Sequence, residues 1–135
     1  STFLYNYRFL KFLSFFLVWL NFFLFGVECT PKCKIGFGLV LPHSSGIVIG
    51  ATSIGNNVTI FQGVTLGAQE ADMSYDPDTR PSVGNGVTIG SGAKILGNIK
   101  IGNDVVIGAN SVVLKDVYDS EVVGGIPAKI IKTKD

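Results

Sequence analysis

Aliphatic residues recur at every sixth position along most of this chain, and this period constrains the fold more than any other feature. The longest unbroken series is Val83, Ile89, Ile95, Ile101, Ile107 and Val113; two shorter series are Ile35, Leu41, Ile47 and Ile54, Ile60, Leu66. A glycine often follows directly, which is typical of a turn after a short strand. A period of six predicts a parallel β-helix, because an amphipathic α-helix would repeat near 3.6 residues.

Three such units make one coil of about 18 residues, with one inward aliphatic side chain on each of three faces. No unit buries its apolar side alone, so stacked neighbours stabilise one another. The six-residue period over residues 29–118 therefore predicts an all-β domain of roughly five coils. Both cysteines keep the register, since Cys29 lies six positions before Ile35 and Cys33 lies six before Leu39. They are predicted as small core residues in a reducing compartment, neither metal ligands nor nucleophiles.

Residues 1–27 have a different composition from the rest. They contain eight of the ten phenylalanines, the only tryptophan, no acid, and only Arg8 and Lys11 as bases. We expect residues 1–27 to form a hydrophobic helix and residues 28–135 to form the β-helix domain. A membrane span needs about 20 mostly apolar residues, and polar residues interrupt this segment. Packing on the domain or on a neighbouring subunit is the favoured interpretation, with peripheral membrane contact as the alternative.

Residues 68–82 interrupt the period with a polar loop that holds four acids and two prolines. Loops on a rigid scaffold often carry function. A net charge of +1 gives no basic field for nucleic acid. The single histidine excludes a metal site built from several histidines of one chain, and no metal is expected.

Four stretches resemble the hexapeptide-repeat acyltransferases: residues 42–50, 54–66, 89–114 and 125–129. The resemblance is greatest to the serine acetyltransferase branch, which includes polysaccharide O-acetyltransferases, and it covers residues 28–132. It implies a left-handed parallel β-helix, a homotrimer, and acetyl-CoA bound in the groove between adjacent subunits. The expected location is the cytoplasm, with possible contact at the inner face of the membrane.

His43 is the candidate general base. It lies on a turn where side chains face outward, and an imidazole titrates near neutral pH, as a base for a hydroxyl requires. In the family that it resembles, the histidine of the matching Pro-His-x-x-Gly run removes the acceptor proton. A carboxylate fifteen positions earlier orients that histidine, and the residue at this distance here is Glu28.

The resemblance also implies positions for acetyl-CoA. Ala68, Ser91 and Ala109 are small corner residues that let the pantetheine arm approach the backbone. Lys129, together with Lys115, is expected to meet the CoA phosphates.

Departures from the family pattern bear on the acceptor. The serine enzymes carry an aspartate before the base and an Arg-His pair before the proline that follows the loop. Pro42 stands at the first position, and Thr79 and Arg80 stand at the pair. Pro42 cannot supply the carboxylate that would pair with the ammonium group of serine. We therefore expect transfer to a sugar hydroxyl in surface polysaccharide biosynthesis, with Thr79 and Arg80 as acceptor-binding residues. Serine O-acetylation for cysteine biosynthesis is the alternative, and a non-enzymatic β-helix scaffold is the second alternative.

Overall fold

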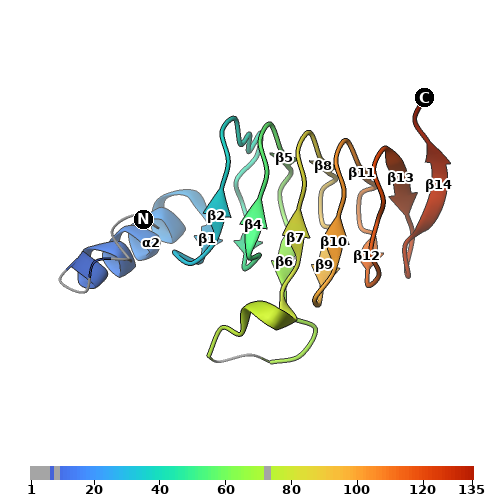
Figure 1. Cartoon of the computed structure of the whole chain (residues 1–135). Coiled ribbons are helices and arrows are strands. Elements are labelled where there is room, and N and C mark those ends of the chain that lie inside the picture. The colour runs from blue at the N-terminus through green and yellow to red at the C-terminus, as the bar shows by residue number, and fades with distance from the viewer. Residues whose placement is uncertain (1–6, 8–9, 72–73) are drawn as a thin grey trace.

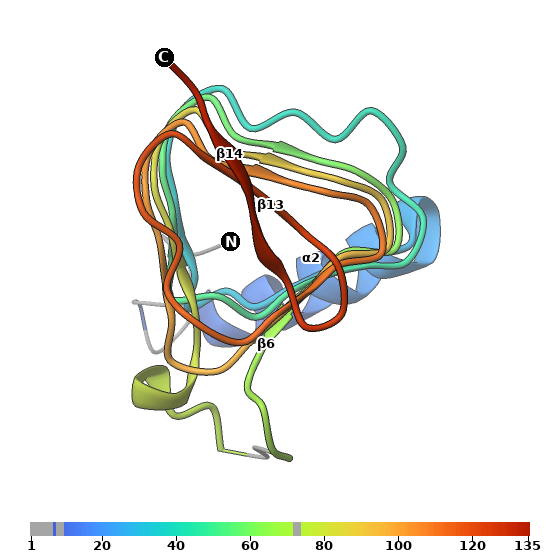
Figure 2. The same ribbon diagram turned by 90° about the vertical axis from the view of Figure 1, so that its right-hand side faces the viewer.

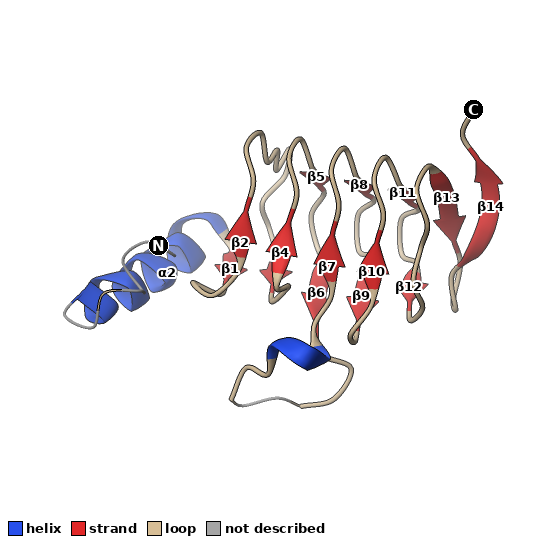
Figure 3. Cartoon of the chain, viewed as in Figure 1, coloured by secondary structure: helices blue, strands red, loops and turns tan. Residues whose placement is uncertain are grey.

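The computed structural model describes residues 7, 10–71 and 74–135. Short strands wind into a three-sided prism whose coils stack along one axis (Figures 1 and 3). The first sheet contains β1 (Val27–Cys29), β3 (Ile47–Ile49), β6 (Thr65–Gly67), β9 (Lys94–Leu96) and β12 (Val112–Val113). The second contains β2 (Lys34–Ile35), β4 (Ser53–Ile54), β7 (Ser82–Val83) and β10 (Lys100–Ile101). The third contains β5 (Thr59–Ile60), β8 (Thr88–Ile89), β11 (Val106–Ile107), β13 (Glu121–Gly124) and β14 (Lys129–Thr133).

The prism is a left-handed parallel β-helix, as expected. Figure 2 views it from the C-terminal end, and there the chain runs clockwise as it approaches the viewer. Strands pair in parallel from coil to coil, except that β14 pairs antiparallel with β13 and ends the third sheet.

The predicted inward aliphatic residues form the core. Ile60, Ile89 and Ile107 stack in the third sheet, and each is 1% exposed or less. Val83 and Ile101 pair in the second sheet, and three periods of six separate them, as one full coil requires. The six-residue period therefore identifies the core correctly through most of the prism.

The expected register is wrong at one place, between the first two coils. Ile49, not Ile47, pairs with Leu66. Val40 pairs with Thr59, and Val48 pairs with Thr65. The chain therefore advances eight residues between these pairs in the first coil but only six in the second. The two extra residues make the corner before β3 stand out from the stacked corners (Figure 2).

Two edges of the prism carry several of the predicted site residues. We call edge I the corner where the chain passes from the third sheet to the first; it contains residues 41–46, 61–64, 90–93 and 108–111. We call edge II the corner where the chain passes from the first sheet to the second; it contains residues 68–71, 74–81, 97–99 and 114–116. Hydrogen bonds link successive coils along edge I, from Gly46 N–H to Gly26 O and from Asn110 N–H to Ser91 O.

The predicted loop leaves the prism at edge II (Figure 1). Thr88 pairs with Thr59 in the coil before it and with Val106 in the coil after it, so the loop lengthens the coil between Thr59 and Thr88. It contains a 3₁₀-helix, η2 (Pro77–Thr79). The carboxylate of Asp76 caps this helix by accepting the Asp78 N–H at 2.9 Å.

Helix α2 (Lys11–Phe25) precedes β1, and residues 1–6 and 8–9 of the expected helical segment lie outside the described residues. Gly26 ends the helix at φ +67°, a conformation that suits glycine, and its N–H bonds to Phe22 O at 2.8 Å. Most of the helix surface is aromatic and exposed; Phe12 is 83% and Phe23 is 72% accessible. Within the described residues, no helix is long and apolar enough to cross a membrane.

Candidate functional site

A groove of about 320 Å³ crosses the outer face of the first sheet. Its lining comes from α2, β1, β3, β6 and the loop at edge II: Phe15, Val18, Glu28, Cys29, Thr30, Pro31, Val48, Ile49, Gly50, Thr65, Leu66, Gly67, Tyr75 and Arg80. The sheet supplies a rigid floor, and the loop supplies the polar wall.

Arg80 enters this groove from the end of the loop. Its Nη1 donates to Gly50 O at 3.2 Å, and its guanidinium carbon lies 4.4 Å from the centre of the Tyr75 ring. The Tyr75 hydroxyl donates to Ala51 O at 2.9 Å, which ties the loop to the prism. These contacts hold the Arg80 cation at the groove wall.

Glu28 lines the same groove. It sits in β1 between two residues that point into the core, so its side chain faces outward and is exposed. Glu28 pairs with Val48 in the next coil, and Val48 pairs with Thr65 in the coil after that. The groove therefore holds one carboxylate and one guanidinium.

His43 is exposed on the protruding corner of edge I, five positions before Val48. Within the described part of the chain, no hydrogen bond or ion pair joins His43 to Glu28. The pairing of these two residues therefore stays a prediction. The outward position expected for His43 agrees with its exposure.

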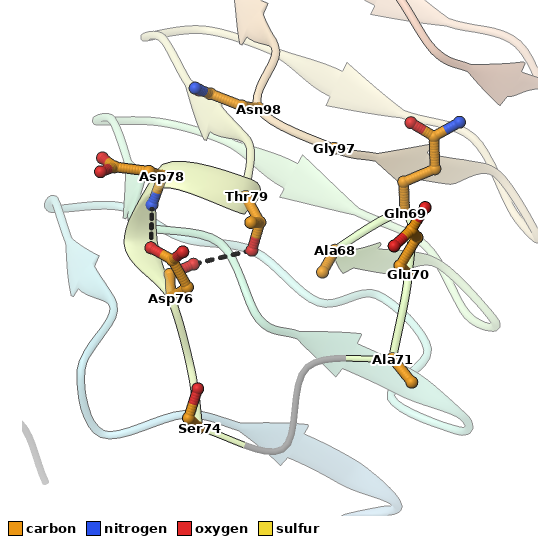
Figure 4. Close-up of a pocket in the computed structure, with 10 residues that line it drawn as sticks. All are labelled: Ala68, Gln69, Glu70, Ala71, Ser74, Asp76, Asp78, Thr79, Gly97 and Asn98. Atoms are coloured by element: carbon orange, nitrogen blue, oxygen red, sulfur yellow. Dashed lines mark hydrogen bonds between the residues drawn. The ribbon is translucent and has the colours of Figure 1, made fainter.

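The predicted CoA residues fall on both edges. Ser91 and Ala109 lie on edge I, in successive coils, and a Cβ on Gly90 would stand 2.6 Å from Ala109 N. Backbones therefore approach closely at this corner. Ala68 lies on edge II, where it lines a pocket of about 770 Å³ beneath the loop (Figure 4).

Thr79 and Arg80 are neighbours in the sequence but serve different cavities. Thr79 lines the pocket beneath the loop, and its hydroxyl donates to Asp76 O at 2.8 Å (Figure 4). Arg80 lines the groove over the first sheet. The expectation that both bind the acceptor therefore holds geometrically only if the acceptor spans two cavities.

Lys115 and Lys129 come together at the C-terminal end of the prism, where they line a mostly apolar pocket of about 550 Å³. Lys129 begins β14 and Lys115 follows β12. Two cations at one pocket rim are suited to a phosphorylated ligand.

The cysteines have the environment that the period predicts. Cys33 is fully buried, and Cys29 packs against the core. Burial raises the pKa of both thiols, that of Cys33 from 9.0 to about 12. Thiols of this kind are poor nucleophiles. Among the described residues, no cluster of His, Cys, Asp or Glu could hold a metal ion.

Tyr75 is a site residue that the sequence offers only as one of several polar groups of the loop, with no role of its own. Its contacts depend on how the loop folds back over Ala51, and no local pattern encodes that path. The available signal was a single aromatic residue within an otherwise polar, acidic loop.

Comparison with known proteins identifies relatives for this arrangement. Residues 80–115 match the family model described as bacterial transferase hexapeptide (six repeats). A serine acetyltransferase of Staphylococcus aureus (strain Mu50) is 50% identical over 108 residues, which cover 79% of this chain and 49% of the relative. A solved serine acetyltransferase in complex with CoA has a TM-score of 0.86 at 44% identity, covering 96% of this chain and 52% of that one. A serine acetyltransferase in complex with cysteine has a TM-score of 0.90 at 40% identity, covering 99% and 51%.

The chain spans about half the length of the curated relatives that it matches. It matches the hexapeptide repeat of bacterial transferases, and the relatives and solved structures that it resembles are serine acetyltransferases.

The expectation of a sugar acceptor is wrong. Relatives at about 50% identity are serine acetyltransferases, which favours the alternative. That expectation rested on Pro42, which has no charge for the ammonium group of serine. The fold instead places Glu28 and Arg80 in one groove, where they present opposite charges.

Proposed function

We propose that this chain is the catalytic domain of an acetyl-CoA-dependent serine O-acetyltransferase. The observation that carries the proposal is the 50% identity to a serine acetyltransferase over 108 residues. The groove with Arg80 supports it, because the carboxylate of serine needs a cationic partner.

In this proposal His43 is the general base. Its imidazole takes the proton of the serine hydroxyl while the oxygen attacks the thioester carbonyl of acetyl-CoA. The new C–O bond forms, the C–S bond breaks, and the imidazolium returns its proton to the departing sulfur. Glu28 orients the imidazole and stabilises its charged form. Backbone N–H groups at edge I are suited to the developing oxyanion.

Arg80 binds the serine carboxylate. A guanidinium presents its N–H groups as a planar fork, which matches a carboxylate. Tyr75 and Gly50 already hold this side chain at the groove wall, so little side-chain freedom is lost on binding.

Acetyl-CoA is bound by Ala68, Ser91, Ala109, Lys115 and Lys129. Ser91 and Ala109 lie on edge I whereas Ala68 lies on edge II, so these positions occupy two corners of the prism. One extended ligand contacts both corners most directly when one subunit supplies edge I and its neighbour supplies edge II. This arrangement supports a homotrimer with a CoA site in each of its three grooves between subunits.

The test is CoA release in the presence of acetyl-CoA and either L-serine or a panel of sugars. We expect turnover with L-serine and a loss of about 10²–10⁴-fold in kcat for His43→Ala, with the far-UV circular dichroism unchanged. Glu28→Gln should lower kcat and leave the KM for acetyl-CoA unchanged. If the wild-type chain releases no CoA with L-serine, the proposal fails.

Oligomeric state is measured on the same preparations by sedimentation. A monomer that turns over at full rate at micromolar concentration would contradict the site shared between subunits. If Glu28→Gln raises only the KM for serine, then Glu28 binds the substrate and does not orient the base.

A further inference from the structure

Tyr75 has an unusual backbone for its side chain. Its φ is +57°, in the left-handed region that non-glycine residues rarely adopt. A bulky residue stays in such a conformation only when its surroundings impose it. One contact that holds Tyr75 in place is the hydrogen bond from its hydroxyl to Ala51 O, 24 positions earlier in the chain.

Two cations lie against the same aromatic ring. The Arg80 guanidinium carbon is 4.4 Å from the ring centre, and Lys32 Nζ is 4.8 Å from it. Both distances are within the range of cation–π attraction. Tyr75 lines the groove with Arg80 and also lines a separate pocket with Lys32, so it is common to the two cavities.

We propose that Tyr75 is a positioning residue that fixes Arg80 for the carboxylate of the acceptor, and so contributes to the preference for an amino acid over a neutral alcohol. The inference rests on the proposed serine acetyltransferase function. The hydroxyl anchors the loop to the prism, and the ring then holds the planar guanidinium against one side of the groove. Gly50 O fixes a second point of the same guanidinium.

Two substitutions separate the anchor from the ring. Tyr75→Phe keeps the aromatic platform and removes the hydrogen bond to Ala51. Tyr75→Leu removes the platform as well and keeps an apolar side chain of moderate size. We expect Tyr75→Leu to raise the KM for L-serine about tenfold, with the KM for acetyl-CoA changed less than twofold. Tyr75→Phe should raise the KM for serine less than Tyr75→Leu does, because the ring that contacts the guanidinium remains.

Two further readouts distinguish positioning from a general structural effect. L-serinamide lacks the carboxylate, so Tyr75→Leu should leave its KM nearly unchanged. In an Arg80→Ala background, Tyr75→Leu should add almost nothing to the KM for serine, because the residue that it positions is absent. Thermal unfolding of each variant checks that the loop substitution leaves the prism folded.

The outcomes separate this inference from the function on which it rests. If the wild-type chain does not acetylate L-serine, the proposed function fails. If it does, and Tyr75→Leu leaves the serine KM unchanged or impairs serine and serinamide equally, the positioning role is refuted. Full additivity of Tyr75→Leu and Arg80→Ala would refute it as well.

Discussion

A glycine column at the corner between the second and third sheets sets how closely the coils stack. A Cβ on Gly84 would stand 2.6 Å from Gly102 O and 2.8 Å from Gly102 C. Real Cβ atoms do not approach backbone atoms so closely, and these belong to the next coil, whose strands are hydrogen-bonded in register. Gly84→Ala must therefore push two coils apart, and we expect a loss of about 2 kcal/mol in the free energy of unfolding.

Gly67→Ala is the matched control. Gly67 is buried whereas Gly84 is half-buried, yet the nearest atom to a Cβ on Gly67 is Thr65 Cγ2 at 4.0 Å. We expect a change within about 0.5 kcal/mol, because the alanine fits and also restricts the unfolded chain. Burial alone would predict the opposite order of the two variants.

The assay is urea-induced unfolding followed by far-UV circular dichroism at one fixed protein concentration. If Gly84→Ala unfolds at the wild-type urea midpoint, or if Gly67→Ala is the more damaging change, the contact argument is wrong. A change in the slope of the transition would show that coils unfold separately, as repeat proteins can.

Three further predictions concern the thiols, the lysines and the helix. The pKa of the Cys33 thiol is raised from 9.0 to about 12, so its contribution to stability is complete below pH 9 and is lost as the pH rises toward 12; Cys33→Ala should flatten this decline in thermal unfolding scans. Lys115→Ala combined with Lys129→Ala should raise the KM for acetyl-CoA and leave that for acetyl-pantetheine unchanged, and equal effects on both would remove these lysines from phosphate binding. Removal of residues 1–26 should preserve the β-sheet circular dichroism and reduce binding of a hydrophobic dye, since most of the exposed aromatic residues lie on α2; loss of the β-sheet signal would show that the helix supports the prism.

The six-residue period predicts which side chains point inward but not where a coil contains extra residues. Ile47 and Ile49 show the reason, because both are buried, at 0% and 2% exposure. Side chains alternate along a strand, so a slip of two positions returns every side chain to the same face. The sequence pattern is therefore equally satisfied with either isoleucine opposite Leu66. In the structure the strands pair so that Ile49 lies opposite Leu66. Because of this register, the corner that contains His43 protrudes.

The site was less predictable than the fold, because its polar groups come from segments whose paths the period does not determine. Thr79 and Arg80 are adjacent in sequence, yet one faces the pocket beneath the loop and the other faces the groove. Glu28 and Arg80 are far apart in sequence, yet both line that groove. Neither the neighbours of the base nor the residues at the loop end reveal this pair on their own. Pro42 before His43 consequently does not determine the acceptor. The position of the Arg80 cation depends on how the loop returns across the first sheet.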